Sequence, residues 1–380
     1  MAVTISKSFL TKTYRHFLSM SANKLTVLKE IGQIANQRFT SLSYPKHRLG
    51  LICGGRGNLG DDAMLEAAER LFPNARLLPY IYPKQEGRFE LIGLSGIRYF
   101  DSVILGGGTL ISSTWFDMVR TALQQGLGVW SLGTGVGSSG FDQPNHIDLS
   151  AWKPLLADFQ RLGVRGPRSK DMLNAMGLAN AEVVGDLALS LTQDHLTALA
   201  DSPRFALNIS VPVGQSYNEG EYIRLQELEL VLPKLIHQGW QPVPVAMHPS
   251  DVEPIRQLLQ RLSMEHLPIP VLSSADDFFE LVSPCSFTIA VRLHAAVLSC
   301  CVGVPPLMLG YRDKCLDFME SMHLEDWHIG LQTAQPSEIS DKVLLLAQAG
   351  LPMRSQILNQ AKLWKTSIRT YISDLVPLYV

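Results

Sequence analysis

From residue 46 onward, short apolar runs alternate with longer segments whose apolar residues recur at helical spacing. Many of the short runs end in glycine or in a charged residue. Strands that alternate with helices need crossover connections, so this pattern predicts parallel sheets covered by helices on both faces. The expected strands are 49–52, 75–79, 102–105, 128–132, 164–165, 182–184, 205–211, 241–245, 271–272, 287–291 and 306–309. The expected helices are 61–72, 116–125, 152–162, 169–176, 222–237, 251–262 and 295–301.

A polar stretch interrupts this alternation and divides the chain into two halves. Residues 192–203 show no apolar periodicity, and the strand–helix pattern restarts after them. We therefore expect an α/β fold with two Rossmann-like domains facing each other across a cleft. The expected domains are 46–195 and 203–345.

Two helical segments are expected outside these domains. The tail, 346–380, should pack back across the junction between them. The extension, 1–45, carries Leu25, Leu28, Ile31 and Ile34 at helical spacing. Such a stripe normally packs on the protein's own body. The alternative is a weak contact with a membrane surface or a partner.

Composition narrows the class of protein. A hydrophobic content of 46% and a charged content of 18% are typical of compact folded proteins. A net charge of −2 gives no reason to expect a nucleic-acid partner. No run approaches the roughly 20 apolar residues of a membrane span, and residues 1–23 lack the apolar core of a signal peptide. Five cysteines without metal-ligand spacing indicate reduced thiols in a cytoplasmic protein and no metal site.

The first candidate loop, GGRGNLGDDA at 54–63, follows a predicted strand and opens a helix. Its glycines from Gly55 onward fit the spacing G-x-G-x-x-G of dinucleotide-binding proteins. Asp61 and Asp62 at the helix start would oppose a pyrophosphate there, and no acidic residue closes the next strand. We therefore favour a sugar-like or other polar ligand over NAD. The alternative is a plain turn in which Asp61 or Asp62 caps the helix.

Two further glycine-rich loops follow predicted strands, GGGTLIS at 106–112 and GTGVG at 133–137. Backbone N–H groups and the hydroxyl of Thr109 suit oxygen ligands. Simple turns between a strand and a helix tolerate many residue types. We therefore expect these glycines to let the backbone approach a bound molecule closely.

Cations and histidines gather at other strand ends. Arg292 and His294 follow the strand 287–291, and Tyr311, Arg312 and Lys314 follow the strand 306–309. Open α/β sheets bind ligands at this place, and guanidinium groups match carboxylate or phosphate oxygens. The cluster favours an anionic ligand handled by acid–base chemistry. The alternative is a satisfied core histidine beside a surface arginine.

Other polar residues at strand ends have simpler alternatives. Arg165 and Arg168, in RGPRSK at 165–170, could be a surface charge run. Asp186 follows the strand 182–184 and is expected to cap the next turn; the alternative is that it orients a ligand. His248 follows the strand 241–245, where Ser250 or Asp251 is expected to cap the following helix.

Taken together, these loops resemble the polysaccharide pyruvyl transferase family. The resemblance spans about residues 50–320 and rests on the segments GGRGNLGDDA (54–63), LGGGTL (105–110), GTGVG (133–137), VRGPRS (164–169), VGD (184–186), VRLHAAVLSCCVGVPPL (291–307) and YRDKCLDF (311–318). It implies a fold like that of GT-B glycosyltransferases. It also implies transfer of the pyruvyl group of phosphoenolpyruvate to two hydroxyls of a sugar, with release of phosphate and formation of a cyclic ketal. Such an enzyme would serve exopolysaccharide or cell-wall glycan biosynthesis.

The resemblance also implies roles for the site residues. Arg165, Arg292 and His294 would hold phosphoenolpyruvate, and the loop of Asn58 and Asp61 would face the sugar acceptor. The full phosphoenolpyruvate-binding set is expected to be Arg165, Arg168, Arg292, His294 and Lys314. The expected acceptor-binding set is Gly57, Asn58, Asp62, Gly108, Thr109 and His248.

The chemistry fits these residue types. Phosphoenolpyruvate carries a carboxylate and a phosphate, for which arginines are natural receptors. Ketal formation needs a proton donor for C3 and a base for the attacking hydroxyls. His294 is the leading acid–base candidate, with Asp61 or Asp62 as a second base. The reaction needs no metal or cofactor besides phosphoenolpyruvate as co-substrate.

Two other functions stay open. The first is a GT-B glycosyltransferase that uses a nucleotide sugar, which would need an acidic residue placed for the ribose hydroxyls. The second is a non-catalytic sugar- or anion-binding protein, because a fold does not imply a function. If the acceptor is a lipid-linked glycan, the extension 1–45 would have a reason to contact the membrane.

Overall fold

The structure of the protein is a computed structural model that describes residues 47–54, 57–79, 100–137, 149–210, 219–348 and 350–375. The expected helical extension, 1–45, lies outside these residues. So do Gly55 and Arg56 of the first glycine loop.

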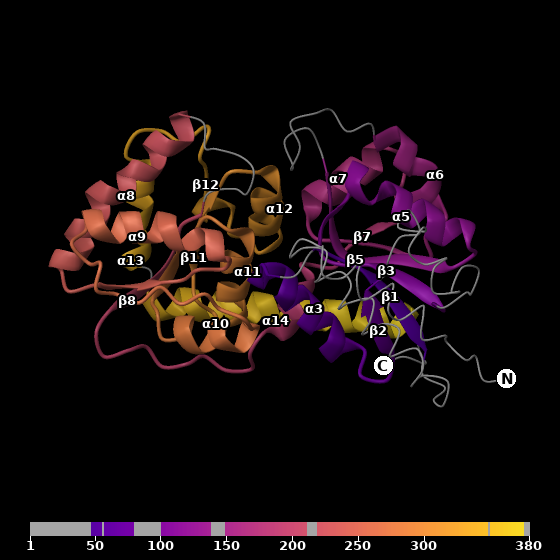
Figure 1. The fold of residues 1–380 in the computed structure, drawn as a ribbon, viewed down its shortest axis with the longest axis horizontal. Helices are drawn as coiled ribbons and strands as arrows, with labels where there is room; N and C mark the ends of the chain where they lie inside the picture. Colours follow the sequence, from indigo (N-terminus) through magenta and orange to yellow (C-terminus); the bar gives the residue numbers. More distant parts are fainter. Residues whose placement is uncertain are drawn as a thin grey trace, which may run out of the picture. The chain divides into compact units, whose positions relative to one another are not determined.

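The first half of the chain forms a sheet whose described strand pairs are all parallel (Figure 1). Its order is β2 (Arg76–Pro79), β1 (Arg48–Ile52), β3 (Ser102–Leu105), β5 (Gly128–Val136), β6 (Leu162–Val164) and β7 (Ala181–Val183), and β4 (Gly108–Ile111) also pairs with β5. The helices of this half are α3 (Leu59–Leu71), α5 (Ser113–Gln124), α6 (Trp152–Ala157) and α7 (Pro167–Ala175), with 3-10 turns η4 (Leu149–Ala151) and η5 (Leu187–Leu191). Strands β3 and β6 are buried throughout, as expected for a sheet covered on both faces.

The second half forms another parallel sheet, ordered β12 (His328–Gly330), β11 (Pro306–Gly310), β10 (Phe287–Ala290), β8 (Arg204–Asn208) and β9 (Gln241–Pro244). Its helices are α8 (Glu219–His237), α9 (Val252–Arg261), α10 (Ala275–Val282), α11 (Leu293–Cys301), α12 (Asp313–Ser321) and α13 (Glu338–Ala347). The 3-10 turns η6 (Pro249–Asp251) and η7 (Glu325–Trp327) complete it.

Several expected elements differ from the structure. The segment 133–137 was expected to be a loop, but all except its last residue continue strand β5. The expected strand 271–272 is only an isolated bridge between Val271 and Ala246. The sequence pattern missed β4, β12, α10, α12 and α13. The strands β4 and β12 span only four and three residues and contain glycine, so they show too little of a period to be recognised.

In each sheet, the order in which successive strands are added changes direction at one strand. In the first sheet β2 lies on one side of β1 and β3 on the other; in the second, β9 and β10 flank β8 in the same way. Ligands of open α/β sheets bind outside the carboxyl ends of the strands at such a switch point. The loops after β1, β3 and β10 therefore occupy the places where a ligand is expected.

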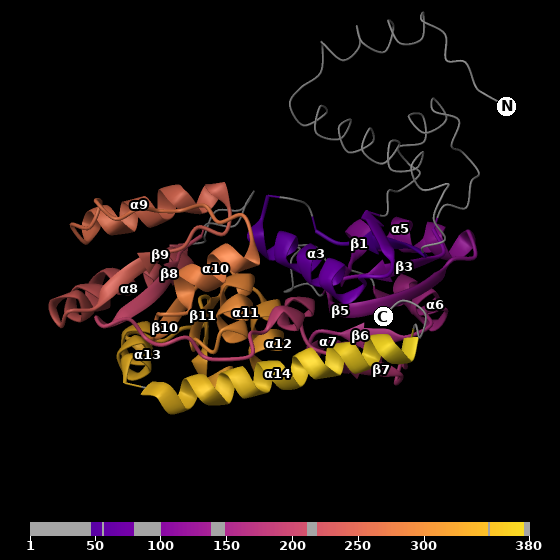
Figure 2. The ribbon, with the colours of Figure 1, turned by 90° about the horizontal axis from the view of Figure 1, so that it is seen from below.

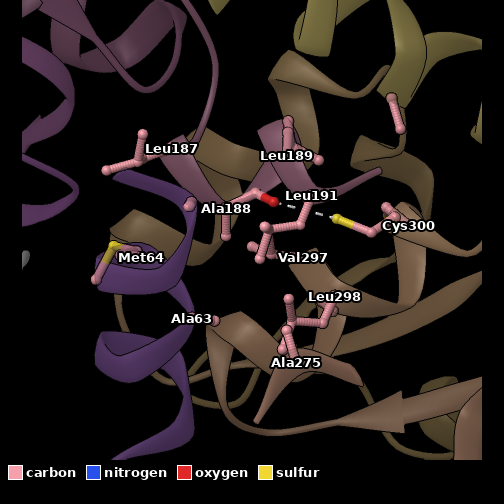
Figure 3. Packing of buried hydrophobic residues seen from close by; sticks show 14 of the residues in the cluster. Ala63, Met64, Leu187, Ala188, Leu189, Leu191, Ala275, Val297, Leu298 and Cys300 are labelled. Atoms are coloured by element: carbon pink, nitrogen blue, oxygen red, sulfur yellow. Dashed lines mark hydrogen bonds between the residues drawn. The ribbon is translucent and has the colours of Figure 1, made fainter. Parts of the chain in front are cut away.

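A shared hydrophobic core joins the two halves. Helix α11 is apolar on nearly all sides, and every residue of it except His294 is buried. It packs with α3 and η5 of the first half in one continuous cluster (Figure 3). Cluster residues labelled there include Ala63 and Met64 of α3, Leu187 and Leu189 of η5, and Val297 and Leu298 of α11. The first turns of α3 and α11 are thereby held together.

The long helix α14 (Gly350–Leu375) contacts both halves (Figure 2). Arg354 donates through Nη2 to the carbonyl of Ser283 in the second half, at 2.8 Å. Tyr371 donates through its hydroxyl to the carbonyl of Ser131 in the first half, at 2.9 Å. Helix α14 therefore ties the two sheets together. No helix among the described residues is both long and apolar enough to cross a membrane.

Candidate active site

A pocket of about 240 Å³ opens where the strand-end loops of both halves meet. The first half contributes residues after β1 and β6, in β4 and on α5; the second half contributes residues after β10 and β11. Eight of the residues predicted from the sequence line it: Asn58, Asp61, Gly108, Thr109, Arg165, Arg292, His294 and Lys314. Gly54, Leu110, Trp115, Leu293 and Tyr311 complete the lining.

The first turn of α3 presents Asp61 to the pocket. Asn58 caps the helix, because its Oδ1 accepts from the N–H of Gly60 at 3.2 Å. The alternative in which Asp61 or Asp62 caps the helix is therefore wrong. Asn58 Nδ2 donates to Asp61 Oδ2 at 3.3 Å. A Cβ on Gly54 would collide with the Asp61 carboxylate, so the glycine makes room for that side chain.

Burial changes the acidity of Asp61. It raises the pKa of this carboxyl from 3.8 to about 6. The nearby charge of Asp62 raises the pKa further, whereas Lys314, the hydrogen bond from Asn58 and Arg292 lower it. Asp61 is therefore largely protonated below pH 6, so it is suited to deliver a proton.

Arg165 follows β6 and is buried, with only 1% of its side chain exposed. Its Nε donates to Oδ2 of Asp186 at 2.9 Å, and the Asp186 side chain is fully buried. Arg165 is thus an internal charge held by an internal carboxylate, not part of a surface charge run. Its Nη1 is buried and has no hydrogen-bond partner within the protein. An ion pair of this kind with one unused donor is suited to receive an anion.

Arg292 is held in the same way by a carboxylate of its own half. Its Nε lies 2.7 Å from Oδ2 of Asp251 and its Nη2 lies 2.6 Å from Oδ1. Asp251 is fully buried and also accepts from the N–H of Met247 at 3.1 Å. Asn208 accepts from the N–H of Arg292 at 2.9 Å. Asp251 therefore fixes Arg292; its side chain is not the helix cap that we expected.

His294 lies in the first turn of α11 and packs against α3. A Cβ on Gly60 would collide with the imidazole ring, so only glycine allows this contact. The ring is 13% exposed, and its Nε2 is buried without a hydrogen-bond partner within the protein. This Nε2 lies 3.8 Å from Oδ1 of Asp186, which belongs to the other half.

The pKa of His294 is lowered to about 4, mainly by burial. Asp186 raises this pKa, while Arg165, Lys314 and Arg292 lower it. The ring is neutral at pH 7 and can therefore accept a proton. Between about pH 4 and pH 6, Asp61 is therefore mainly protonated while the His294 ring is mainly neutral. Pairs of this type mark acid and base roles in enzyme sites.

Three buried polar atoms without protein partners line the same pocket: Thr109 Oγ1, Arg165 Nη1 and His294 Nε2. Each buried polar group left unpaired costs roughly 1–3 kcal/mol. Native proteins contain few such groups, and they often belong to functional sites. Their convergence indicates a ligand that offers both hydrogen-bond acceptors and donors.

Four predicted site residues do not line this pocket. The N–H of Gly57 donates to Asp62 Oδ2 at 3.2 Å in an exposed turn. Arg168 donates through Nε to Oε1 of Glu320 at 3.0 Å on the surface. His248 is itself the cap of η6, because its Nδ1 accepts from the N–H of Ser250 at 3.1 Å. This corrects the expected cap by Ser250 or Asp251.

The glycine-rich segments serve two different purposes. A Cβ on Gly133 would lie 2.6 Å from the carbonyl of Gly185, and one on Gly107 would collide with Met64. These glycines therefore allow the chain to pack against itself, which corrects the expectation that 133–137 approaches a bound molecule. Gly108 has φ of +102° and lines the pocket, and its approach to a bound molecule stays a prediction.

Sequence reasoning missed Trp115 and the two pairing carboxylates. Trp115 lies in the first turn of α5 and lines the pocket beside Leu110. An aromatic residue just after the glycine loop 106–112 was a usable signal. Asp186 does cap η5 as predicted, since its Oδ1 accepts from the N–H of Ala188 at 3.0 Å. The ion pairs of Asp186 with Arg165 and of Asp251 with Arg292 were not predicted. In the described part of the chain, no group of three or more His, Cys, Asp or Glu side chains is placed to hold a metal ion.

Comparisons with known proteins place the chain among related sequences and folds. A family model described as "Polysaccharide pyruvyl transferase" matches residues 58–313. A search of curated proteins gives no significant match. Among solved structures, a UDP-N-acetylglucosamine 2-epimerase, named as putative, from Listeria monocytogenes has a TM-score of 0.58 at 14% identity, covering 87% of this chain and 96% of that one.

Two further solved structures show the same fold. UDP-GlcNAc 2-epimerase from Neisseria meningitidis, bound to UDP-GlcNAc, has a TM-score of 0.52 at 11% identity, covering 87% of this chain and 100% of that one. A glycosyltransferase from Rickettsia africae has a TM-score of 0.51 at 11% identity, covering 88% of this chain and 99% of that one. The predicted GT-B-like fold with parallel sheets is thereby confirmed.

Proposed function

The chain belongs to the polysaccharide pyruvyl transferase family, and from that premise we propose that it transfers the pyruvyl group of phosphoenolpyruvate to a sugar of a glycan or its precursor. The product is a cyclic pyruvate ketal on two hydroxyls, and phosphate is released. The match of the family model agrees with the resemblance drawn from the loop motifs.

One observation carries this proposal. Two arginines from opposite halves, each paired with a buried carboxylate, line one small pocket together with Lys314. Phosphoenolpyruvate has two anionic groups at opposite ends of a short molecule, and guanidinium groups bind such groups with defined geometry.

The acid–base pair supports a closed proton cycle. Asp61 gives its proton to C3 of phosphoenolpyruvate while the first sugar hydroxyl attacks C2 and His294 takes the hydroxyl proton. The C2–O bond to phosphate then breaks, and His294 returns its proton to the departing phosphate. The second hydroxyl attacks C2, and Asp61 accepts its proton. Two hydroxyl protons are thereby accounted for, one on C3 and one on phosphate, and both side chains regain their initial states.

The acceptor side of the pocket comes from the first half. Asn58, Gly108 and Thr109 offer polar groups for sugar hydroxyls. Trp115 offers an aromatic surface for the apolar face of a pyranose ring. We assign the sugar or glycan to this side because the arginines occupy the other walls of the pocket.

The state of the cysteines agrees with a reaction in the cytoplasm. All five cysteines are free thiols, and four of them are buried. Free buried thiols are typical of proteins from reducing compartments. We therefore place the proposed reaction in the cytoplasm.

The direct test is to incubate the purified full-length protein with phosphoenolpyruvate and a panel of hexosides. We expect phosphate release together with a sugar product that gains the mass of pyruvate less one water. The alternative is transfer from a nucleotide sugar, which the names of proteins of similar fold favour, among them the epimerase bound to UDP-GlcNAc. Release of a nucleoside diphosphate from such a donor, with no phosphate from phosphoenolpyruvate, would support that alternative and end our proposal.

Replacing Asp61 with asparagine is expected to lower kcat by about 10²-fold, because the donor for C3 is lost. The native pKa of about 6 lies above 3.8, so the folded protein binds more protons between these values and loses stability as pH rises through them. Asp61→Asn removes the ionisable carboxyl, and with it the free-energy cost of ionising this group in the folded protein. At pH 8 its unfolding free energy should exceed that of the wild type by up to about 3 kcal/mol. The difference should shrink toward pH 4 in urea titrations.

The neighbouring variant Asp62→Asn is the matched control, since Asp62 does not line the pocket. It should retain most of the activity. In the wild type, kcat/KM should fall as pH rises above about 6. In Asp61→Asn, kcat/KM should show no such decrease. Equal losses in the two variants would contradict the assignment of Asp61.

A further inference from the structure

We propose that Asp186 is a positioning residue of this site that serves two functional groups at once. It holds the guanidinium of Arg165 in place, and it stabilises the ring of His294 when that ring takes a proton during turnover. This inference rests on the proposed function, and it deepens it by naming the residue that links anion binding to proton transfer.

The geometry of Asp186 carries the proposal. Its side chain is fully buried at the start of η5. Oδ2 accepts from Arg165 Nε at 2.9 Å, and Oδ1 accepts from the N–H of Ala188 at 3.0 Å. These two bonds fix the plane of the carboxylate. Oδ1 also lies 3.8 Å from His294 Nε2, an atom with no hydrogen-bond partner within the protein.

A carboxylate has room for such a third partner. Its two oxygens together offer about four acceptor positions, of which the hydrogen bonds from Arg165 and Ala188 use two. A neutral ring at 3.8 Å makes no hydrogen bond. A protonated ring gains both a donor and a charge, so a small movement of the ring brings Nε2 into hydrogen-bond distance. In this role Asp186 only accepts the hydrogen bond, and the proton stays on the ring.

The charged groups around His294 single out this carboxylate. Arg165 comes from the first half, Arg292 and Lys314 come from the second, and all three disfavour a protonated ring. Asp61 lines the same pocket from α3. Asp186 is the acidic group that favours the protonated ring. A base surrounded by three cations needs such a counter-charge to accept a proton.

The contact also crosses the junction between the halves. Asp186 and Arg165 belong to the first half, and His294 begins helix α11 of the second. Because the carboxylate of Asp186 is bonded to Arg165, a displacement of Arg165 would also change the distance between this carboxylate and His294. Asp251 makes a similar pair with Arg292, but that pair lies within the second half. The chain thus offers a matched comparison between two buried carboxylate–arginine pairs.

The test compares Asp186→Asn with Asp251→Asn in the full-length protein. We expect both variants to raise KM for phosphoenolpyruvate, since each loosens one arginine. Only Asp186→Asn should also lower kcat by about 10²-fold, because the base loses its counter-charge. Asp186→Ser, which keeps a capping oxygen for η5, should behave like Asp186→Asn and replaces it if the asparagine variant does not fold.

Each variant is then combined with His294→Gln. If Asp186 acts on kcat through the ring, Asp186→Asn should lower kcat no further once the ring is gone. Asp251→Asn should keep its full effect in the same background. Losses in kcat that multiply fully for Asp186→Asn and His294→Gln would overturn the proposal.

A second measurement needs no turnover. In protein labelled with ¹³C-histidine, the His294 signal is identified by its loss in His294→Gln. In the wild type it should begin to titrate as pH approaches 4, and in Asp186→Asn it should stay at its neutral position. Identical titration in both proteins would overturn the role of Asp186 even if the enzyme is active. A shifted titration in a protein that releases no phosphate would uphold the link between the residues and end the proposed function instead.

Discussion

Replacing His294 with glutamine is expected to lower kcat by about 10³-fold, within the range that acid–base groups contribute, while phosphoenolpyruvate still binds. The ring is neutral at pH 7, lines the pocket and has a buried Nε2 without a protein partner. Glutamine keeps a similar volume beside Gly60 but cannot exchange a proton near neutral pH. The rate of phosphate release measures the loss of turnover, and calorimetric titration with phosphoenolpyruvate measures binding.

The control for this prediction is His248→Gln. His248 also follows a strand of the second half, but it caps η6 and does not line the pocket. Its replacement should leave turnover close to that of the wild type. Wild-type activity in His294→Gln, or an equal loss in His248→Gln, would show that the base has been assigned to the wrong histidine.

Replacing Arg165 with methionine is expected to abolish binding of phosphoenolpyruvate and to lower the unfolding free energy by about 3–5 kcal/mol. The large effect on stability arises because Asp186 would keep a buried charge without its partner. The double variant Arg165→Met/Asp186→Asn removes both charges. It should regain most of the stability but none of the binding. Urea denaturation and calorimetric titration separate the two effects.

Arg168→Met is the matched control in the same RGPRS segment. Arg168 pairs with Glu320, and 43% of its side chain is exposed. Exposed pairs contribute about 0–1 kcal/mol, so we expect little change in stability and none in binding. If Arg168→Met lost binding and Arg165→Met kept it, the interior arginine would be structural and the surface arginine functional.

The parallel α/β fold and most of the site could be predicted from the sequence because both depend on local order. A parallel strand carries the residues that follow it to one edge of its sheet. The runs before Asn58, Arg165 and Arg292 identified such edges, and all three residues line the pocket. The short strand β12 escaped this reasoning, since its three residues are too few to show a repeat.

The residues that were wrongly predicted to belong to the site have one feature in common. The glycines of 133–137 and the residues Arg168 and His248 were judged by their chemical type and by their place after a strand. Whether such a residue meets a ligand depends on what packs beside it. Gly133 meets the carbonyl of Gly185, Arg168 meets Glu320, and His248 caps its own turn.

The sequence alone determined which residue types stand at the ends of the strands, because apolar periodicity and glycine positions are local properties of the chain. Only the tertiary structure decided their partners and their protonation. Asp186 lies 21 residues from Arg165, and Asp251 lies 41 residues from Arg292. His294 meets Gly60 and Asp186 only because one core joins the two sheets. Burial and distance set the charge of each group, and neither quantity is encoded in a short stretch of sequence.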